Sequence, residues 1–265
     1  MFPELRQCQQ IEADDYQSLY QNVLIDLPVG EYFRKFLEEE TAAASVDPDF
    51  QNDIHYIAEV MKDYSLTQIQ LRVKKIWIQE FHKFCMAELD ETSATVMDDL
   101  LKFEADQRTI QIIANSFAFK ELNDARNRVT YRTKFMCNLG YLYPERFEKL
   151  TNCDNPKALM DALECTPYHR TLHGVQLTNE AAEGQENVGG SDDQFDFAQA
   201  KEASAKYSMA FENAFHFGVF FAYLKLKDLE IKNVSWLSDL VSMNLGKGNV
   251  AEWQRYTVPF TYHNN

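Results

Sequence analysis

The sequence contains few of the residues that interrupt helices. Among 265 residues there are only 9 glycines and 7 prolines, and no run of alternating apolar and polar residues bounded by turns is found. This pattern favours helices over a turn-rich β fold. Because 45% of the residues are hydrophobic and 13% are aromatic, the composition excludes a disordered chain and suffices for one large or two modest domains with a core.

Cysteine is scarce and scattered, and long hydrophobic runs are missing. The number of cysteines is odd, which is typical of reduced thiols in a cytosolic protein: Cys8, Cys85, Cys137, Cys153 and Cys165. Residues 1–6 contain no apolar run and do not resemble a signal peptide. The most apolar segment, residues 214–224, is about half as long as a spanning helix and is interrupted by His216. We therefore expect no direct membrane span.

The motifs of most metal and phosphate sites are also missing. No histidine follows a glutamate by three residues, which excludes the paired Glu-x-x-His motifs of a di-iron bundle, and there is no phosphate-binding glycine loop. Zinc could use the spacing of Cys165, His169 and His173, with Cys153 upstream. Because Pro167 interrupts the helix that would align them, we expect no metal, no cofactor and no catalytic residue. The least favoured alternative is a metal-dependent helical enzyme that uses Cys165, His169 and His173.

Positive charge is in short supply, and the deficit is uneven. The net charge of −15 comes mainly from residues 1–63, with 14 acids and 4 bases, and from residues 174–200, with 6 acids and no base. Residues 64–173 carry 15 of each. This distribution argues against nucleic acid and polybasic membrane binding and favours basic protein partners. A simply solvated acidic surface is equally compatible with it.

Apolar residues recur at helical steps along most of the chain. The predicted helices cover residues 16–27, 32–37, 50–61, 66–84, 93–119, 123–135 and 156–164, followed by a long helix or helix pair from about 192. Four segments result: an acidic helical segment 1–63, a central helical lobe 64–173, a flexible acidic linker 174–191 and a C-terminal helical lobe 192–265.

Several residues are expected to begin or end these helices. Thr92 or Ser93 would cap the helix that begins near residue 93. Gly140 would cap the end of the following helix, with Pro144 starting the next one. Pro156 repeats that start signal.

The helix near residue 106 combines an apolar stripe with an acid inside it. Its stripe is formed by Leu100, Phe103, Ile110, Ile113 and Phe117. Asp106 falls on the same face, and a buried carboxylate must be paired or hydrogen-bonded. Glu104 and Arg108 lie on the other side, four residues apart in the order that favours an ion pair.

A second stretch repeats this pattern. Aligning residues 104–113 with residues 228–237 keeps acid, acid, base and apolar positions in register, so that Asp228, Glu230, Lys232 and Trp236 correspond to Glu104, Asp106, Arg108 and Ile112. Two such copies indicate an internally duplicated helical unit.

Several stretches, in order along nearly the whole chain, resemble the family of V-type ATPase d subunits and archaeal C subunits. They are Phe-Glu-Ala-Asp-Gln-Arg at 103–108, Gly-x-Leu-Tyr-Pro-Glu at 140–145, and Ala-Phe-x-Asn-x-Phe-His-Phe-Gly-Val-Phe-x-Ala at 210–222. The resemblance implies an all-α fold in which three similar lobes form a funnel, and the duplicated unit would represent about two of the three. It also implies a peripheral position on the cytoplasmic face of vacuolar or other endomembranes, with the proteolipid c-ring and the central stalk subunits as partners.

The sequence departs from the family pattern at several points. Residues 1–4 align well inside the family sequence, so we expect the first lobe to be missing, either by truncation or because another chain supplies it. Gln107 replaces the usual basic residue after the acid, and Leu27 replaces a threonine. Residues 47–63 and 174–191 look lengthened.

The sequence thus predicts a non-catalytic subunit that couples the rotor stalk of a V-type proton-pumping ATPase to its membrane ring. The alternative is a freestanding helical scaffold or assembly factor derived from the same fold. Asp106 and Glu230 are expected to stabilise helix packing within their lobes. Glu104, Arg108 and Lys232 would be their polar neighbours or face the funnel. Asp228 and Trp236 are also expected either to belong to the structural network or to contact a partner.

Overall fold

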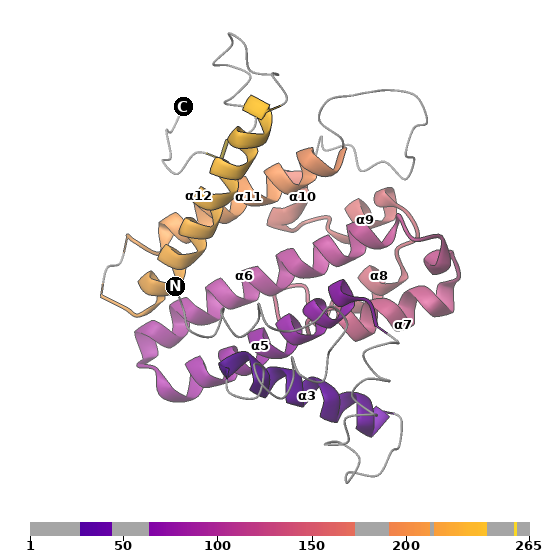
Figure 1. Ribbon diagram of the computed structural model, residues 1–265, viewed down its shortest axis with the longest axis horizontal. Coiled ribbons are helices and arrows are strands. Elements are labelled where there is room, and N and C mark those ends of the chain that lie inside the picture. The colour runs from indigo at the N-terminus through magenta and orange to yellow at the C-terminus, as the bar shows by residue number, and fades with distance from the viewer. Residues whose placement is uncertain (1–26, 44–63, 173–190, 213–214, 243–256, 259–265) are drawn as a thin grey trace. The chain divides into compact units, whose positions relative to one another are not determined.

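The computed structural model describes residues 27–43, 64–172, 191–212, 215–242 and 257–258 (Figure 1). Within these ranges every regular element is a helix and there is no strand, so the predicted all-α fold is confirmed. The elements are α3 (Pro28–Ala43), α5 (Leu66–Glu88), α6 (Glu91–Ser116), the 3₁₀ turn η3 (Lys120–Asn123), α7 (Ala125–Phe135), α8 (Phe147–Asn152), α9 (Pro156–Ala162), α10 (Pro167–Leu172), α11 (Ser191–Met209) and α12 (Gly218–Ser242).

The chain divides into two compact units, residues 1–81 and residues 82–265, and α5 runs across their boundary. The four segments expected from the sequence stay predictions. The helices predicted at 16–27 and 50–61 fall almost entirely outside the described residues. The predicted linker at 174–191 does so too, apart from its last residue.

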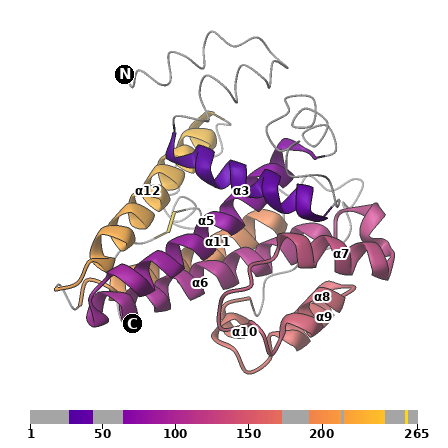
Figure 2. The ribbon, with the colours of Figure 1, turned by 90° about the horizontal axis from the view of Figure 1, so that it is seen from below.

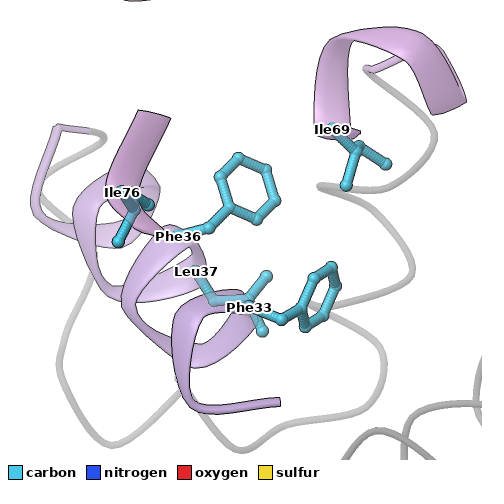
Figure 3. Close-up of a cluster of buried hydrophobic side chains, with 5 residues drawn as sticks. All are labelled: Phe33, Phe36, Leu37, Ile69 and Ile76. Carbon is cyan, nitrogen blue, oxygen red and sulfur yellow. The ribbon is translucent and has the colours of Figure 1, made fainter. Parts of the chain in front are cut away.

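The first unit is held by aromatic and branched side chains between α3 and α5. Phe33, Phe36 and Leu37 of α3 meet Ile69 and Ile76 of α5 in a buried cluster (Figure 3). These residues recur at three- and four-residue steps, which is why each helix buries one stripe. The predicted 32–37 helix is therefore real but longer.

Charged groups beside this core are paired. Arg72 of α5 is buried and donates to Glu39 at 2.8 Å and to Glu40 at 3.1 Å, both on α3. Tyr64 donates its hydroxyl to Glu40 as well. Lys35 of α3 donates to Glu80 of α5 at 2.8 Å. Two acids of the N-terminal segment thus neutralise a base on α5, and one of its bases pairs with an acid of α5.

The second unit is organised around α6. This helix contacts α7, α11 and α12, and α7 and α12 lie toward its opposite ends in both views (Figures 1 and 2). It begins with Asp90 as N-cap, whose carboxylate accepts from the backbone of Ser93 at 3.1 Å, so the predicted cap at Thr92 or Ser93 was wrong. Ser93 is buried and serves another contact: its hydroxyl accepts from the Phe217 amide at 3.0 Å.

Short helices α8, α9 and α10 follow α7. The predicted start of α9 at Pro156 is confirmed, with Asn155 as N-cap accepting from Ala158 at 2.8 Å. The predicted helix cap at Gly140 was wrong, because α7 ends at Phe135 and Gly140 lies in a later turn with φ +127°. The helix expected to start at Pro144 begins at Phe147.

The predicted C-terminal helix pair is present as α11 and α12, which pack against each other. Apolar residues recur at helical spacing through residues 207–229, but this stripe is not buried throughout. Between the two helices Phe215 is 99% exposed. No helix within the described ranges is long and apolar enough to cross a bilayer.

We predict that Phe36→Ala lowers the free energy of unfolding of the first unit by about 3–5 kcal/mol, because a fully buried ring leaves a cavity between α3 and α5. Urea denaturation followed by the fluorescence of Trp77 measures this change in a background of Trp236→Phe and Trp253→Phe. The exposed neighbour Glu38 provides the control, since Glu38→Ala is expected to change the value by no more than about 0.5 kcal/mol. Equal effects of the two substitutions would contradict the assigned core.

A buried carboxylate junction as candidate functional site

Asp106 joins three parts of the second unit. Its carboxylate is completely buried on α6. One oxygen accepts from the Tyr141 amide at 2.9 Å and the Tyr168 hydroxyl at 2.9 Å, and the other accepts from the Leu142 amide at 3.2 Å. The 140–142 turn and α10 are thereby fixed to the middle of α6.

Gly140 makes this approach possible. A Cβ at this position would lie 2.0 Å from an Asp106 carboxylate oxygen. The backbone there also has φ +127°, a conformation that side chains with a Cβ rarely adopt. Glycine is therefore required twice over, by backbone conformation and by space.

The electrostatics of Asp106 reflect a balance between burial and hydrogen bonds. Burial raises its pKa to about 6, while the donors on Tyr168, Leu142 and Tyr141 act in the opposite direction. Because the folded-state pKa lies above the ordinary value of 3.8, the contribution of this group to stability is complete below about pH 3.8 and is lost as pH rises toward 6. Burial, and then the nearby Asp106 charge, also raises the pKa of Tyr168.

Glu104, two residues earlier, forms a second junction with α11 and α12. One carboxylate oxygen accepts from Lys225 of α12 at 2.7 Å and from Arg108 at 3.0 Å, and the other accepts from the Tyr207 hydroxyl of α11 at 2.5 Å. The predicted Glu104–Arg108 ion pair forms. It does not lie on a free outer face, however, because α11 and α12 cover this side of α6 and the Glu104 side chain is only 12% exposed.

The Glu104 network is strongly biased toward the ionised carboxylate. Burial by itself raises the pKa of Glu104, but the charges of Lys225 and Arg108 and the hydrogen bonds from Lys225 and Tyr207 outweigh it and lower the pKa to about 2. Burial beside Glu104 raises the pKa of Tyr207 well above its usual value, so this phenol stays a donor.

The second copy of the sequence motif does not reproduce this geometry. Glu230, the counterpart of Asp106, is exposed on α12 and pairs with Lys227 at 2.6 Å, so its expected burial in helix packing was wrong. The reason is its phase on the helix, since α12 buries Ala222, Leu229 and Asn233 instead. Asp228 and Lys232 are exposed, and Trp236 is half-buried. The structure therefore brings Glu104, Asp106 and Arg108 together on α6 and places the other four predicted residues elsewhere.

One central residue carries no obvious sequence signal. Arg132 of α7 is completely buried, and it donates to the Ser116 hydroxyl at 2.8 and 3.0 Å and to the carbonyls of Leu150, Thr151 and Cys153. Burial lowers its pKa to about 10. The guanidinium joins the end of α6 to the end of α8. The polar helix α7 carries three further bases, so the sequence alone does not distinguish Arg132 from them.

The residues considered for zinc do not form a described site. Cys165 is exposed, with φ 63°, His169 lies on α10, and His173 is outside the described residues. In the part of the chain that the structure describes, no group of three or more His, Cys, Asp or Glu side chains could hold a metal ion. Asn233-Val-Ser has the residue pattern of a glycosylation acceptor. The Asn233 side-chain amide is already hydrogen-bonded, because it exchanges two 3.0 Å hydrogen bonds with the Val258 backbone.

Comparison with known proteins identifies the family to which this helical scaffold belongs. The model of the family described as ATP synthase (C/AC39) subunit matches residues 2–252. The chain belongs to the ATP synthase (C/AC39) subunit family.

Three relatives of this C/AC39 chain illustrate the range of similarity. V-type proton ATPase subunit d1 of Arabidopsis thaliana is 30% identical over 232 residues, which cover 88% of this chain and 56% of the relative. V-type proton ATPase subunit d of Dictyostelium discoideum is 30% identical over 227 residues, covering 86% and 53%. The Saccharomyces cerevisiae subunit d is 24% identical over 232 residues, covering 88% and 56%. The chain thus spans about half the length of the curated relatives it matches.

In this C/AC39 chain, the carboxylates of Glu104 and Asp106 on α6 are both engaged by donors of the protein itself. Asp106 takes three such donors and Glu104 takes an ammonium, a guanidinium and a phenol. Such contacts resist relative sliding of helices, because a shift would leave a buried charge without partners. The arrangement is suited to mechanical bracing.

We predict that Asp106→Ala lowers the free energy of unfolding by about 1–3 kcal/mol, because three buried donors lose their acceptor. Gly140→Ala should be destabilising as well, and the double variant should lose less than the sum of the two, since removing the carboxylate relieves the clash. Chemical denaturation of all four proteins measures the coupling, with the exposed loop variant Asn138→Ala as control. Additive losses would contradict the proposed contact.

A second prediction concerns the pH dependence of the Glu104 junction. Its folded-state pKa of about 2 lies below the ordinary 4.5, so its stabilising effect is complete above pH 4.5 and is lost as pH falls toward 2. Glu104→Gln should cost on the order of 3 kcal/mol at pH 7 and progressively less toward pH 3. Urea denaturation at several pH values measures the difference, with the exposed Glu164→Gln as control. A pH-independent difference would show that the ion pairs do not stabilise the fold.

Proposed function

We propose that this chain is a non-catalytic subunit of a V-type proton-pumping ATPase that couples the central rotor stalk to the membrane proteolipid ring. The observation that carries the proposal is the family match over residues 2–252, together with relatives that are named V-type proton ATPase subunit d. The chain would lie at the cytoplasmic face of a vacuolar or other endomembrane, as a peripheral component.

The geometry supports a mechanical role. A subunit that transmits torque must resist shear between its helices, and α6 is tied to its neighbours at three points. Asp106 holds the 140–142 turn and α10, Glu104 holds α11 and α12, and Arg132 joins the ends of α6 and α8. Buried charged contacts of this kind have a specific geometry and are costly to break singly.

The exposed charged residues of α12 are candidates for contact with other subunits. Asp228, Glu230 and Lys232 point to the surface, and Trp236 is half-buried beside them in sequence. We propose that these residues contact partner subunits. We also propose that the fold consists of repeated helical lobes.

Co-purification tests the proposed function. The full chain, carrying a C-terminal affinity tag, would be isolated from detergent-solubilised membranes of its source cells and the associated proteins quantified by mass spectrometry. We expect proteolipid ring and central stalk subunits in fixed ratio to the chain. Asp106→Ala is expected to reduce their recovery, because it removes the contacts that hold the 140–142 turn and α10 to α6. Asn138→Ala should leave the recovery unchanged.

Two outcomes would overturn the proposal. Recovery of the chain alone, or only with subunits of the pump at trace and variable ratios, would favour the freestanding scaffold or assembly factor. A particle that pumps protons at the normal rate after deletion of the chain would show that the chain does not couple rotation.

A further inference from the structure

Helix α12 has a second apolar face that points outward. Six large hydrophobic side chains on it or directly before it are 60–67% exposed: Phe217, Phe220, Leu224, Ile231, Val234 and Val241. The opposite side of the same helix carries the buried residues Ala222, Leu229 and Asn233, and α12 packs against α6 and α11. An apolar surface of this extent on a soluble domain marks an interaction site.

The spacing of these side chains is that of a coiled-coil seam. Starting at Phe217, positions separated alternately by three and four residues are 217, 220, 224, 227, 231, 234, 238 and 241. Six of the eight are the exposed hydrophobic residues, and the other two are the exposed Lys227 and Ser238. A repeat of 3.5 residues keeps one stripe in register with a partner helix. We call these eight positions the exposed seam.

We propose that the exposed seam binds one α-helix of another protein, which contributes an apolar heptad stripe, basic residues opposite Asp228 and Glu230 and a carboxylate opposite Lys227. The proposed function names the exposed charged residues of α12 as candidate contacts, whereas this inference concerns the apolar stripe beside them and does not depend on which subunits the chain joins.

The charges beside the seam define the partner. With Phe217 at heptad position a, Asp228 occupies an e position and Glu230 a g position, where coiled coils place the ion pairs that select partners. Both are exposed acids. Partner flanks of Lys or Arg are therefore favoured over acidic ones.

Lys227 sets the register. It lies within the seam at a d position, where a polar residue costs stability unless the partner supplies its complement. In the free chain it pairs with Glu230 at 2.6 Å, but both side chains are about half exposed. Such a surface pair contributes little, so Lys227 is able to turn to a carboxylate on the partner.

The same residues argue against a second copy of this chain as the occupant. Parallel in-register pairing of two α12 helices would place Lys227 against its own counterpart in the seam, and both copies carry a large negative charge. Like charges at a buried layer are unfavourable. The seam is complementary to a basic helix rather than to itself.

A synthetic helical peptide tests the proposed chemistry on the full chain. The probe has four heptads with leucine at positions a and d, a single glutamate at the d position facing Lys227, and lysine at e and g, which keeps it from pairing with itself. We expect the full chain to bind the probe saturably, as measured by fluorescence anisotropy. Leu224→Asp or Ile231→Asp should lower the affinity for the probe about tenfold. Met209→Asp, which changes an exposed residue on α11, should bind as the unmodified chain does.

Charge reversal then separates specific pairing from non-specific adhesion. Lys227→Glu should weaken binding of the probe, and this variant should prefer a peptide with lysine in place of the d-position glutamate. Lys201→Glu, which changes an exposed lysine of α11, should not show this switch. A peptide with glutamate at e and g should bind at least about tenfold more weakly than the probe. Binding that ignores these reversals, or no binding at all, would overturn the proposal.

Photo-crosslinking in source cells tests the natural occupant. A photoreactive residue at position 224 of the full chain should crosslink to a heptad-patterned helical segment of another protein with basic flanks, and one at the exposed position 201 of α11 should not. Crosslinks only to a second copy or to this chain itself would overturn the proposal. So would binding to phosphatidylcholine vesicles that Leu224→Asp abolishes. The co-purification experiment above can fail while these results hold, so the two proposals are judged separately.

Discussion

The second unit depends on keeping one carboxylate out of water. Asp106 lies in the middle of α6 without solvent contact, and the cost of that burial is offset only because two backbone amides and a phenol converge on it from segments far along the chain. The contact dictates where the 140–142 turn and α10 must lie. It also explains why the turn needs a residue without a side chain, since the backbone reaches the carboxylate directly.

Around that point, the structure uses charge where most helical proteins use apolar packing alone. Glu104 draws α11 and α12 onto α6 through an ammonium and a phenol, and Arg132 satisfies carbonyls at the end of α8 that would otherwise lack donors. Hydrogen-bonded charges are more directional than hydrophobic contacts. A helix array joined in this way has one favoured arrangement.

The sequence was informative where the relevant pattern is local. Helical phase placed Asp106 on the apolar stripe of α6 and spaced Glu104 and Arg108 for an ion pair, and short motifs indicated the family that the comparison then showed. The partners of Asp106 lie 35, 36 and 62 residues away, and no periodicity links them. Glu104 was placed on an outer face because one helix by itself does not reveal that two others cover it.

The errors have similar causes. Alignment of the two acidic motifs equated Glu230 with Asp106, but α12 buries a different stripe, so like residues have unlike surroundings. Asp90, and not Thr92 or Ser93, is the N-cap of α6. The Ser93 hydroxyl instead accepts a hydrogen bond from the Phe217 amide. Arg132 was not predicted because it is one of four bases on a polar helix, and only the fold reveals that carbonyl groups of α8 reach it.

The turn at Gly140 has a consequence for evolution. Since a Cβ at this position would lie 2.0 Å from an Asp106 carboxylate oxygen, a change at either position alters the surroundings of the other. A shorter residue in place of Asp106 would remove the clash but not the need for a positive φ at position 140. A relative with a side chain at position 140 is therefore expected to lack this junction in the form described for Asp106.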